Sequence, residues 1–106
     1  MEGKIRLAKQ LIEHYLSHPV GLPAIAEEMN ISYHTLRKWF LRSEGMSMIT
    51  YYQIKRFETA KKMLEDPECA IFQVTHAVGF SAASNFTRWF KHHAGITPSN
   101  YRSQRL

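Results

Sequence analysis

The sequence has very little cysteine and no long hydrophobic run, and each absence excludes a class of protein. Its one cysteine, Cys69, has no partner for an intrachain disulfide or a Cys-x-x-Cys motif, so a disulfide-stabilised fold and a zinc cluster are excluded. No apolar stretch approaches the ~20 residues of a membrane-spanning helix, and the N-terminal residues lack the pattern of a signal peptide. These absences predict a cytoplasmic protein without membrane association.

The sequence also lacks the motifs that indicate catalysis or a bound cofactor. It has no glycine-rich phosphate loop, no nucleophile elbow and no paired carboxylates in a pocket-forming context. His14 and His18 are four residues apart, a spacing that can hold zinc on one helix face, but no third ligand accompanies them in a recognised pattern. We therefore expect a protein that is not an enzyme and that has no metal site and no cofactor.

Acidic residues are fewer than basic ones and are missing from the last third of the chain. The 106 residues include 14 Lys and Arg against 9 Asp and Glu, which gives a formal net charge of +5. No Asp or Glu lies within residues 69–106, and the segment after Ser32 carries Arg37, Lys38 and Arg42 before its first acid. A basic segment that occurs twice favours a polyanionic partner over an ordinary solvated face.

What the sequence does contain is an internal repeat with an offset of about fifty residues. Leu36, Trp39, Phe40 and Gly45 recur as Phe86, Trp89, Phe90 and Gly95. The preceding apolar positions Leu22, Ile25 and Ala26 recur as Ile71, Val74 and Thr75, at an offset shorter by one residue. The second copy therefore has a one-residue insertion in its turn. Each copy has the pattern of a helix, a tight turn and a second helix, which predicts two helix-turn-helix units in one chain.

Apolar residues elsewhere recur at spacings of three and four, which predicts an all-α fold with about seven helices. The expected helices cover about residues 3–18, 23–29, 33–44, 47–65, 71–78, 82–94 and 98–103. This order predicts a first helix-turn-helix subdomain at residues 1–46, a long linker helix at 47–66 and a second helix-turn-helix subdomain at 67–106.

Particular residues are expected to end these helices or to lie in their cores. Ser32 and Ser81 are expected to be N-caps, and Gly79 to adopt a positive φ. The spacing of Trp39 and Trp89 favours core or core-edge positions over platforms for base stacking. The residues expected to be buried are Ile5, Leu7, Ala8, Leu11, Ile12, Tyr15 and Leu16 in the first helix and Ile49, Tyr52, Ile54, Phe57, Ala60, Met63 and Leu64 in the long helix.

The second helix of each unit has one face free for a partner. Leu36 and Phe40 are four residues apart and must face the core, as must Phe86 and Phe90. The opposite faces carry Tyr33, His34, Arg37 and Lys38 in the first copy and Ala83, Ser84, Thr87 and Arg88 in the second. We predict that these residues contact base edges in the major groove, where basic side chains donate to guanine and methyl groups contact thymine. Alternatively, only some touch bases and the rest contact phosphate or water.

Basic residues at the helix ends and on the linker helix are candidates for phosphate contacts, namely Arg42, Lys55, Arg56 and Lys91. For Lys55 and Arg56 the alternative is a surface or intramolecular ion pair. The predicted partner is double-stranded DNA, bound by a monomer at two segments about one helical turn apart, unless the chain is part of a longer dimeric regulator. A helical protein-interaction module without specific DNA binding remains the alternative function.

Three segments of the sequence resemble the DNA-binding domain of AraC/XylS-type transcriptional regulators. They are Gly79-Phe80-Ser81, the run from Ser84 to Lys91, and the run from Gly95 to Arg102, and the similarity extends over roughly residues 5–103. The resemblance implies a seven-helix domain that inserts two recognition helices into neighbouring major grooves at promoters and commonly recruits RNA polymerase. It implies the same base-reading positions, namely His34, Arg37, Lys38, Ala83, Ser84, Thr87 and Arg88.

The chain departs from that family at Thr75, where a small alanine is usual, and this adds bulk where two helices approach. The resemblance also leaves two states of the protein open. The chain is either a complete single-domain regulator or the DNA-binding part of a longer one. A further alternative is the DNA-binding part of a repair methyltransfer protein. That function would require a reactive cysteine, and Cys69 has no activating neighbour in sequence.

Overall fold

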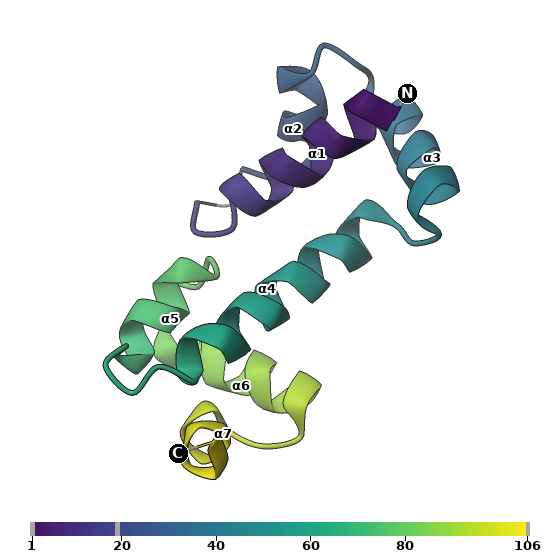
Figure 1. The fold of residues 1–106 in the computed structure, drawn as a ribbon. Coiled ribbons are helices and arrows are strands. Elements are labelled where there is room, and N and C mark those ends of the chain that lie inside the picture. The colour runs from purple at the N-terminus through teal and green to yellow at the C-terminus, as the bar shows by residue number, and fades with distance from the viewer. Residues whose placement is uncertain (1, 19, 106) are drawn as a thin grey trace. The chain divides into compact units, whose positions relative to one another are not determined.

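A computed structural model describes residues 2–18 and 20–105, and these residues form seven α-helices and no strand. The helices are α1 (Glu2–His14), α2 (Leu22–Glu28), α3 (Tyr33–Glu44), α4 (Met48–Leu64), α5 (Ile71–Ala77), α6 (Ala83–Ala94) and α7 (Pro98–Arg105) (Figure 1). The predicted all-α fold is confirmed. No helix among the described residues is long and apolar enough to cross a membrane.

The chain divides into two compact units, Met1–Lys55 and Arg56–Leu106. The boundary falls within α4, which had been predicted as a linker helix between two subdomains. In the structure α4 also belongs to both cores. Met48 and Tyr51 in its first turns are buried in unit 1, whereas Ala60 and Leu64 near its end are buried in unit 2.

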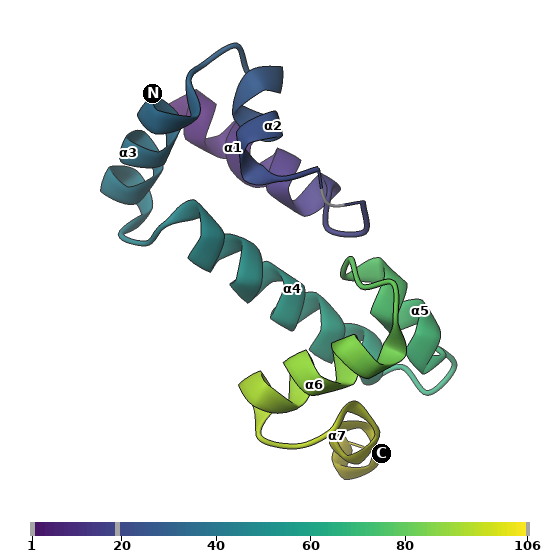
Figure 2. The same cartoon turned by 180° about the vertical axis from the view of Figure 1, so that it is seen from behind.

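The core of unit 1 is formed by α1, α2, α3 and the first turns of α4, whose ribbons Figure 2 shows from behind. Its buried residues are Ile5, Ala8, Ile12, Leu22, Ile25, Ala26, Leu36, Phe40, Met48 and Tyr51. Phe40 packs edge to face against Tyr51, with ring centroids 5.4 Å apart. Because these residues recur at helical spacing on each element, four amphipathic segments are sufficient to enclose one apolar centre.

Unit 2 has its own core, formed by the last turns of α4 with α5, α6 and α7. Its buried residues are Ala60, Leu64, Val74, Val78, Phe86, Phe90 and Tyr101. Phe90 packs edge to face against Tyr101, with ring centroids 5.5 Å apart, in the same way as the phenylalanine and tyrosine of unit 1. Each helix-turn-helix therefore rests on a separate apolar cluster.

The repeat is longer than the sequence prediction proposed, because it includes the helix before each helix-turn-helix and the helix after it. The Tyr51 hydroxyl donates a hydrogen bond to Glu13 Oε2 at 2.8 Å, and the Tyr101 hydroxyl donates one to Glu65 Oε2 at 3.0 Å. Burial and this bond to Glu65 together raise the pKa of Tyr101. The structural repeat is therefore a four-helix arrangement, of which the sequence revealed only the middle.

The caps of α4 and α7 repeat as well. The Ser47 Oγ accepts a hydrogen bond from the backbone N–H of Thr50 at 3.2 Å, and the Thr97 Oγ1 accepts one from the N–H of Asn100 at 3.1 Å. A hydroxyl that bonds to the third residue after it is the usual N-cap geometry. The final helix of each unit thus begins with the same local interaction.

One predicted helix end and several predicted buried positions were wrong. α1 ends at His14 rather than at residue 18, so His14 and His18 do not share a helix face. In the first turns of α4 the buried residues are Met48 and Tyr51, while Ile49 is 58% exposed. Ile49 is predicted to be buried, whereas the packing of α4 on unit 1 buries Met48 and Tyr51 instead. Leu7 and Ile54 are likewise exposed rather than buried.

Candidate nucleic-acid interface

The turn within each helix-turn-helix has the same hydrogen bonding in the two units. In unit 1 the N–H of Ile31 donates to the carbonyl of Ala26 at 3.1 Å, and in unit 2 the N–H of Phe80 donates to that of Thr75 at 3.0 Å. The residue before each donor has a positive φ, 58° for Asn30 and 91° for Gly79. This left-handed residue closes the C-terminus of the first helix and directs the chain into the second. The predicted positive φ of Gly79 is confirmed.

The start of the second helix differs between the units. Ser32 is the N-cap of α3, and its Oγ accepts a hydrogen bond from the N–H of Thr35 at 3.1 Å. Ser81 is not the N-cap of α6, contrary to the prediction, because α6 begins at Ala83 and its N-cap is Ala82, which has no side-chain cap. The one-residue insertion in the second turn places the serine one position too early. α6 therefore begins without the interaction that fixes α3.

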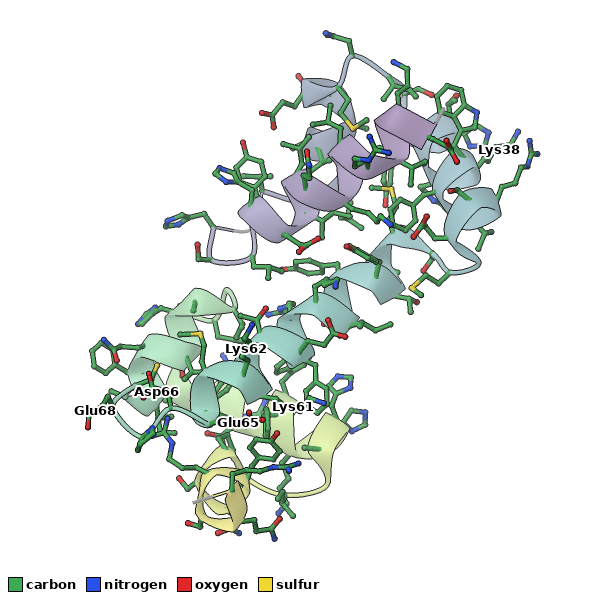
Figure 3. All side chains as sticks on the ribbon, viewed as in Figure 1. Lys38, Lys61, Lys62, Glu65, Asp66 and Glu68 are labelled. Carbon is green, nitrogen blue, oxygen red and sulfur yellow. The ribbon has the colours of Figure 1, made fainter. Side chains whose placement is uncertain are left out.

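On α3 the predicted outer face is accessible. Leu36 and Phe40 are fully buried beneath the helix, as predicted. On the other side His34, Arg37 and Lys38 are exposed, and Lys38 extends away from α3 into solvent (Figure 3). Base contact by these residues stays a prediction, but the scaffold that presents them is in place.

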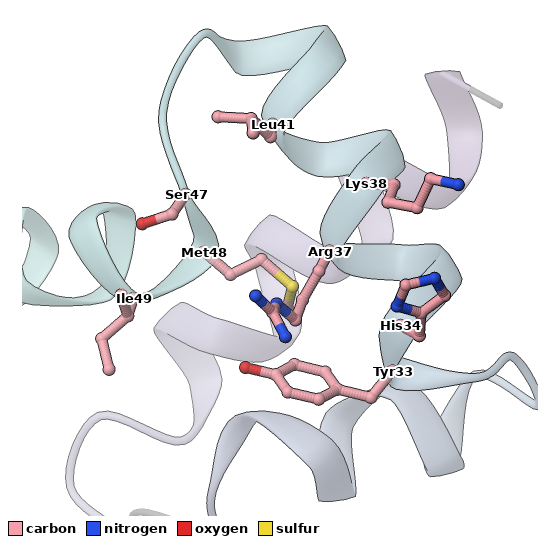
Figure 4. A pocket seen from close by; sticks show the side chains of 8 residues that line it. All are labelled: Tyr33, His34, Arg37, Lys38, Leu41, Ser47, Met48 and Ile49. Carbon is pink, nitrogen blue, oxygen red and sulfur yellow. The ribbon is translucent and has the colours of Figure 1, made fainter.

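α3 also borders a hollow that the sequence did not indicate. Its volume is about 280 Å³, and it is lined by Tyr33, His34, Arg37, Lys38, Leu41, Ser47, Met48 and Ile49. Figure 4 shows the guanidinium of Arg37 turned into this hollow above the ring of Tyr33, whereas Lys38 points away from it. The carbon of that guanidinium is 5.5 Å from the Tyr33 ring centroid, which is within cation–π range. The hollow therefore combines the guanidinium of Arg37 with an apolar floor.

On α6 the predicted outer face is also accessible, but its chemistry is plainer. Phe86 and Phe90 are fully buried, as predicted. Ala83, Ser84 and Arg88 are exposed and Thr87 is half-buried. Only one of these four residues carries a charge. We therefore expect this surface to make fewer base-specific hydrogen bonds than that of α3.

Thr75 is accommodated beneath α6 without an unpaired polar group. Its side chain is 1% exposed, and its Oγ1 donates a hydrogen bond to the carbonyl of Ile71 at 3.0 Å. A buried hydroxyl that bonds to the carbonyl four residues earlier in its own helix satisfies its donor locally. The larger side chain of threonine is thus accommodated at this position by a hydrogen bond within α5.

The two tryptophans are at the edges of the cores, as predicted. Trp39 packs against the core of unit 1 and Trp89 against that of unit 2. The Trp89 ring is 5.2 Å from the Phe80 ring and 5.1 Å from the His93 ring, centroid to centroid. The indole of Trp89 is therefore engaged in packing.

Three of the predicted phosphate contacts are on the surface. Arg42 and Lys91 are exposed in the last turns of α3 and α6. Lys55 is half-exposed on α4, and its Nζ is 5.4 Å from the Tyr51 ring centroid. All three are accessible to a phosphate, and their contact with DNA stays a prediction.

Arg56 corrects the prediction, because its side chain lies in the structure of unit 2 and is only 9% exposed. Its Nε donates a hydrogen bond to the carbonyl of Val78 at 2.9 Å, and its guanidinium carbon is 4.2 Å from the Phe80 ring centroid and 5.0 Å from that of Trp89. A buried guanidinium requires such partners. Arg56 therefore joins α4 to the turn and to α6 and is no longer a candidate phosphate contact.

A surface ion pair joins α1 to the end of α3. Lys9 Nζ lies 2.9 Å from Glu44 Oε1. The hydrogen bond from Lys9 holds the pKa of the Glu44 carboxyl below its ordinary value, although partial burial acts in the opposite direction. This pair fastens the C-terminal turn of α3 to the rest of unit 1.

Within residues 2–18 and 20–105, no three His, Cys, Asp or Glu side chains gather in a way that could hold a metal ion. The two helix-turn-helix units, each with an accessible second helix, place the protein in the class of double helix-turn-helix nucleic-acid-binding domains.

Comparison with known proteins specifies the family. A family model described as a helix-turn-helix domain matches residues 25–104. The HTH-type transcriptional regulator RipA of Corynebacterium diphtheriae is 37% identical over 95% of this chain and 30% of its own length. A transcriptional regulator from Chromobacterium violaceum, described as containing an AraC-type DNA-binding domain, has a TM-score of 0.82 at 28% identity over 99% of this chain and 94% of its own.

The chain belongs to the AraC/XylS family of DNA-binding transcriptional regulators. Its fold is also that of the AdpA DNA-binding domain, solved in complex with a target DNA, with a TM-score of 0.81 at 18% identity over 94% of this chain and 90% of that one. The chain spans about a third of the length of the curated relatives that it matches.

Proposed function

We propose that this chain binds double-stranded DNA with sequence specificity, with α3 and α6 as recognition helices for two adjacent major-groove segments. The observation that carries the proposal is the duplication: two helices of the same length rest on equivalent buried residues and expose their outer faces. Membership of the AraC/XylS family supports the same role, and a domain of this fold is known in complex with DNA.

Within this proposal, each recognition helix has residues of two kinds. Base-edge contacts fall to His34, Arg37 and Lys38 on α3 and to Ala83, Ser84, Thr87 and Arg88 on α6. Phosphate contacts fall to Arg42, Lys55 and Lys91. Because α3 carries more hydrogen-bond donors, the first DNA segment is read more stringently than the second.

The biological role proposed is regulation of transcription from a promoter site, in the cytoplasm and with RNA polymerase as a further partner. Two recognition helices in one chain allow a monomer to bind an asymmetric site. A longer chain that contains this domain could dimerise through its other parts, as the length of the relatives suggests.

The test is selection of binding sites from a randomised duplex library with the purified chain. We expect a bipartite, non-palindromic site, bound one to one and with an affinity that falls steeply as salt is raised. Loss of base contacts in the double variant Arg37→Ala, Lys38→Ala should relax the preference in one segment, at ~1–3 kcal/mol per contact. Lys91→Ala should weaken cognate and random DNA alike.

Two results would contradict the proposal. Equal losses on cognate and random DNA for both variants would remove the assignment of base contacts to α3. An absence of enrichment, together with little dependence on salt, would favour the alternative of a helical protein-interaction module.

A further inference from the structure

We infer that Tyr33 is a specificity-determining residue of the first recognition helix, because it holds the guanidinium of Arg37 in place for contact with a guanine. The inference rests on the proposed function and gives Tyr33 a positioning role in place of the base contact that the sequence predicted for it. Tyr33 and Arg37 are four residues apart on α3, so their side chains are neighbours on one helix face.

The ring of Tyr33 is a fixed platform. It is half-buried and packs against the core of unit 1, in the first turn of α3, where Ser32 caps the helix. The guanidinium carbon of Arg37 is 5.5 Å from its centroid. A free arginine side chain has many rotamers, and packing over an anchored ring removes some of them before DNA arrives.

The surrounding hollow supports the same orientation. Its lining includes Met48, which is 2% exposed, and Figure 4 shows the Arg37 guanidinium and the Met48 side chain on the same side of the Tyr33 ring. Lys38, by contrast, extends away from the hollow. Arg37 is therefore the cation of α3 whose direction is set by neighbouring side chains.

An arginine that stacks on a ring keeps the N–H groups at its edge for hydrogen bonds. Two of these groups match the O6 and N7 acceptors of guanine in the major groove. Because the Arg37 side chain is ordered before DNA binds, its contact should increase discrimination of that base pair rather than the general attraction to phosphate.

Unit 2 provides an internal comparison. The residues equivalent to Tyr33 and Arg37 are Ala83 and Thr87, which have neither a ring nor a cation. The stacked pair is thus specific to the first recognition helix. It gives a physical reason for the more stringent reading proposed for the first DNA segment.

The experiment measures dissociation constants for the selected site and for duplexes in which each G·C pair of the first segment is replaced by A·T. Tyr33→Leu should lower discrimination at one base pair by roughly two- to fivefold, the factor that an exposed cation–π contact supplies. Tyr33→Phe should retain it, because the ring and not the hydroxyl is required. The slope of affinity against salt should not change in either variant, and thermal melting monitors the fold.

The decisive step is a double-mutant cycle. In an Arg37→Ala background, Tyr33→Leu should have no further effect on discrimination, whereas in a Lys38→Ala background its effect should persist. The inference is overturned if Tyr33→Leu leaves discrimination unchanged, if its effect persists without Arg37, or if Tyr33→Phe loses as much as Tyr33→Leu. In these cases wild-type specificity remains and the proposed function stands, whereas a wild-type chain without any sequence preference overturns both.

Discussion

Lys55 and Arg56 are consecutive basic residues on α4 with opposite surroundings. The lysine is accessible on the surface, whereas the guanidinium of the arginine is buried against Phe80 and Trp89 and bonds to a backbone carbonyl. Local charge in the sequence is the same for both residues. Only the three-dimensional packing of unit 2 separates an accessible cation from a buried structural one.

Substitution at these two positions should therefore separate stability from binding. Arg56→Ala leaves the Val78 carbonyl without its donor and should lower the free energy of unfolding by about 1.5–3 kcal/mol. Lys55→Ala is the matched comparison: it removes the contact of a half-exposed lysine with the Tyr51 ring, so it should cost less stability, ~0.5–1 kcal/mol, while weakening DNA binding. Urea denaturation and binding titrations measure the two effects. A stable Arg56→Ala protein would show that the buried contacts contribute little.

The Lys9–Glu44 pair gives a pH dependence with a definite sign. Because the folded pKa of Glu44 is lowered, the carboxylate stabilises the fold above its unfolded pKa of about 4.3, and this contribution is lost as pH falls through the folded value. Glu44→Gln should cost ~0.2–1 kcal/mol at neutral pH and progressively less in acid. Urea denaturation at several pH values tests this, with Glu27→Gln at an exposed position of α2 as control. A cost that did not shrink in acid would contradict the role of this ion pair.

At the scale of elements, the N-terminus of each recognition helix determines how firmly its first turn is held. α3 has a serine cap, whereas α6 has Ala82 at the equivalent position, although its backbone there is extended, with φ −129° and ψ 133°. An extended backbone at the N-cap suits a serine side chain. The first turn of α6 is consequently the one that an added side-chain cap would stabilise.

Three substitutions test these caps, two that remove a serine and one that introduces a serine. Ser32→Ala should destabilise the protein by about 0.5–2 kcal/mol, because it removes the acceptor of the Thr35 N–H. Ser81→Ala should be nearly neutral, and Ala82→Ser should add about 1 kcal/mol. Thermal melting of the three variants is sufficient. A cost for Ser81→Ala equal to that for Ser32→Ala would indicate that Ser81 acts as the cap after all.

The sequence predicted the helices and the buried sides of α3 and α6 because both depend on local spacing. Leu36, Phe40, Phe86 and Phe90 are the buried residues that this spacing indicated. In α4 it indicated Ala60 and Leu64 correctly but misplaced Ile49 and Ile54, since the residues that turn inward in the first half of this helix depend on neighbours distant in sequence. The burial of Arg56 and the hollow beside α3 were missed for the same reason, although the four-residue spacing of Tyr33 and Arg37 was a visible signal.

At the scale of the whole molecule, the two apolar clusters share no residue. Each cluster has one tryptophan at its edge, Trp39 in unit 1 and Trp89 in unit 2. The intrinsic fluorescence of the chain therefore contains one local reporter for each unit.

Deletion of a core ring should destabilise mainly the unit that contains it. Phe40→Ala and Phe90→Ala are equivalent changes at fully buried positions, and each should cost about 3–5 kcal/mol in its own unit. Denaturation followed by fluorescence in a Trp89→Phe background reports unit 1, and in a Trp39→Phe background it reports unit 2. Equal shifts of both reporters for either core variant would mean that the chain unfolds as one cooperative block.

The separation of the two cores also has an evolutionary consequence. Substitutions at exposed positions of α6 need no compensating change in the core of unit 1, because effects at sites that share no partner are close to additive. Over generations the two recognition helices can therefore acquire different DNA preferences independently. The two surfaces already differ in this way: the buried pairs Leu36 with Phe40 and Phe86 with Phe90 are alike in position, while the outer faces have little in common.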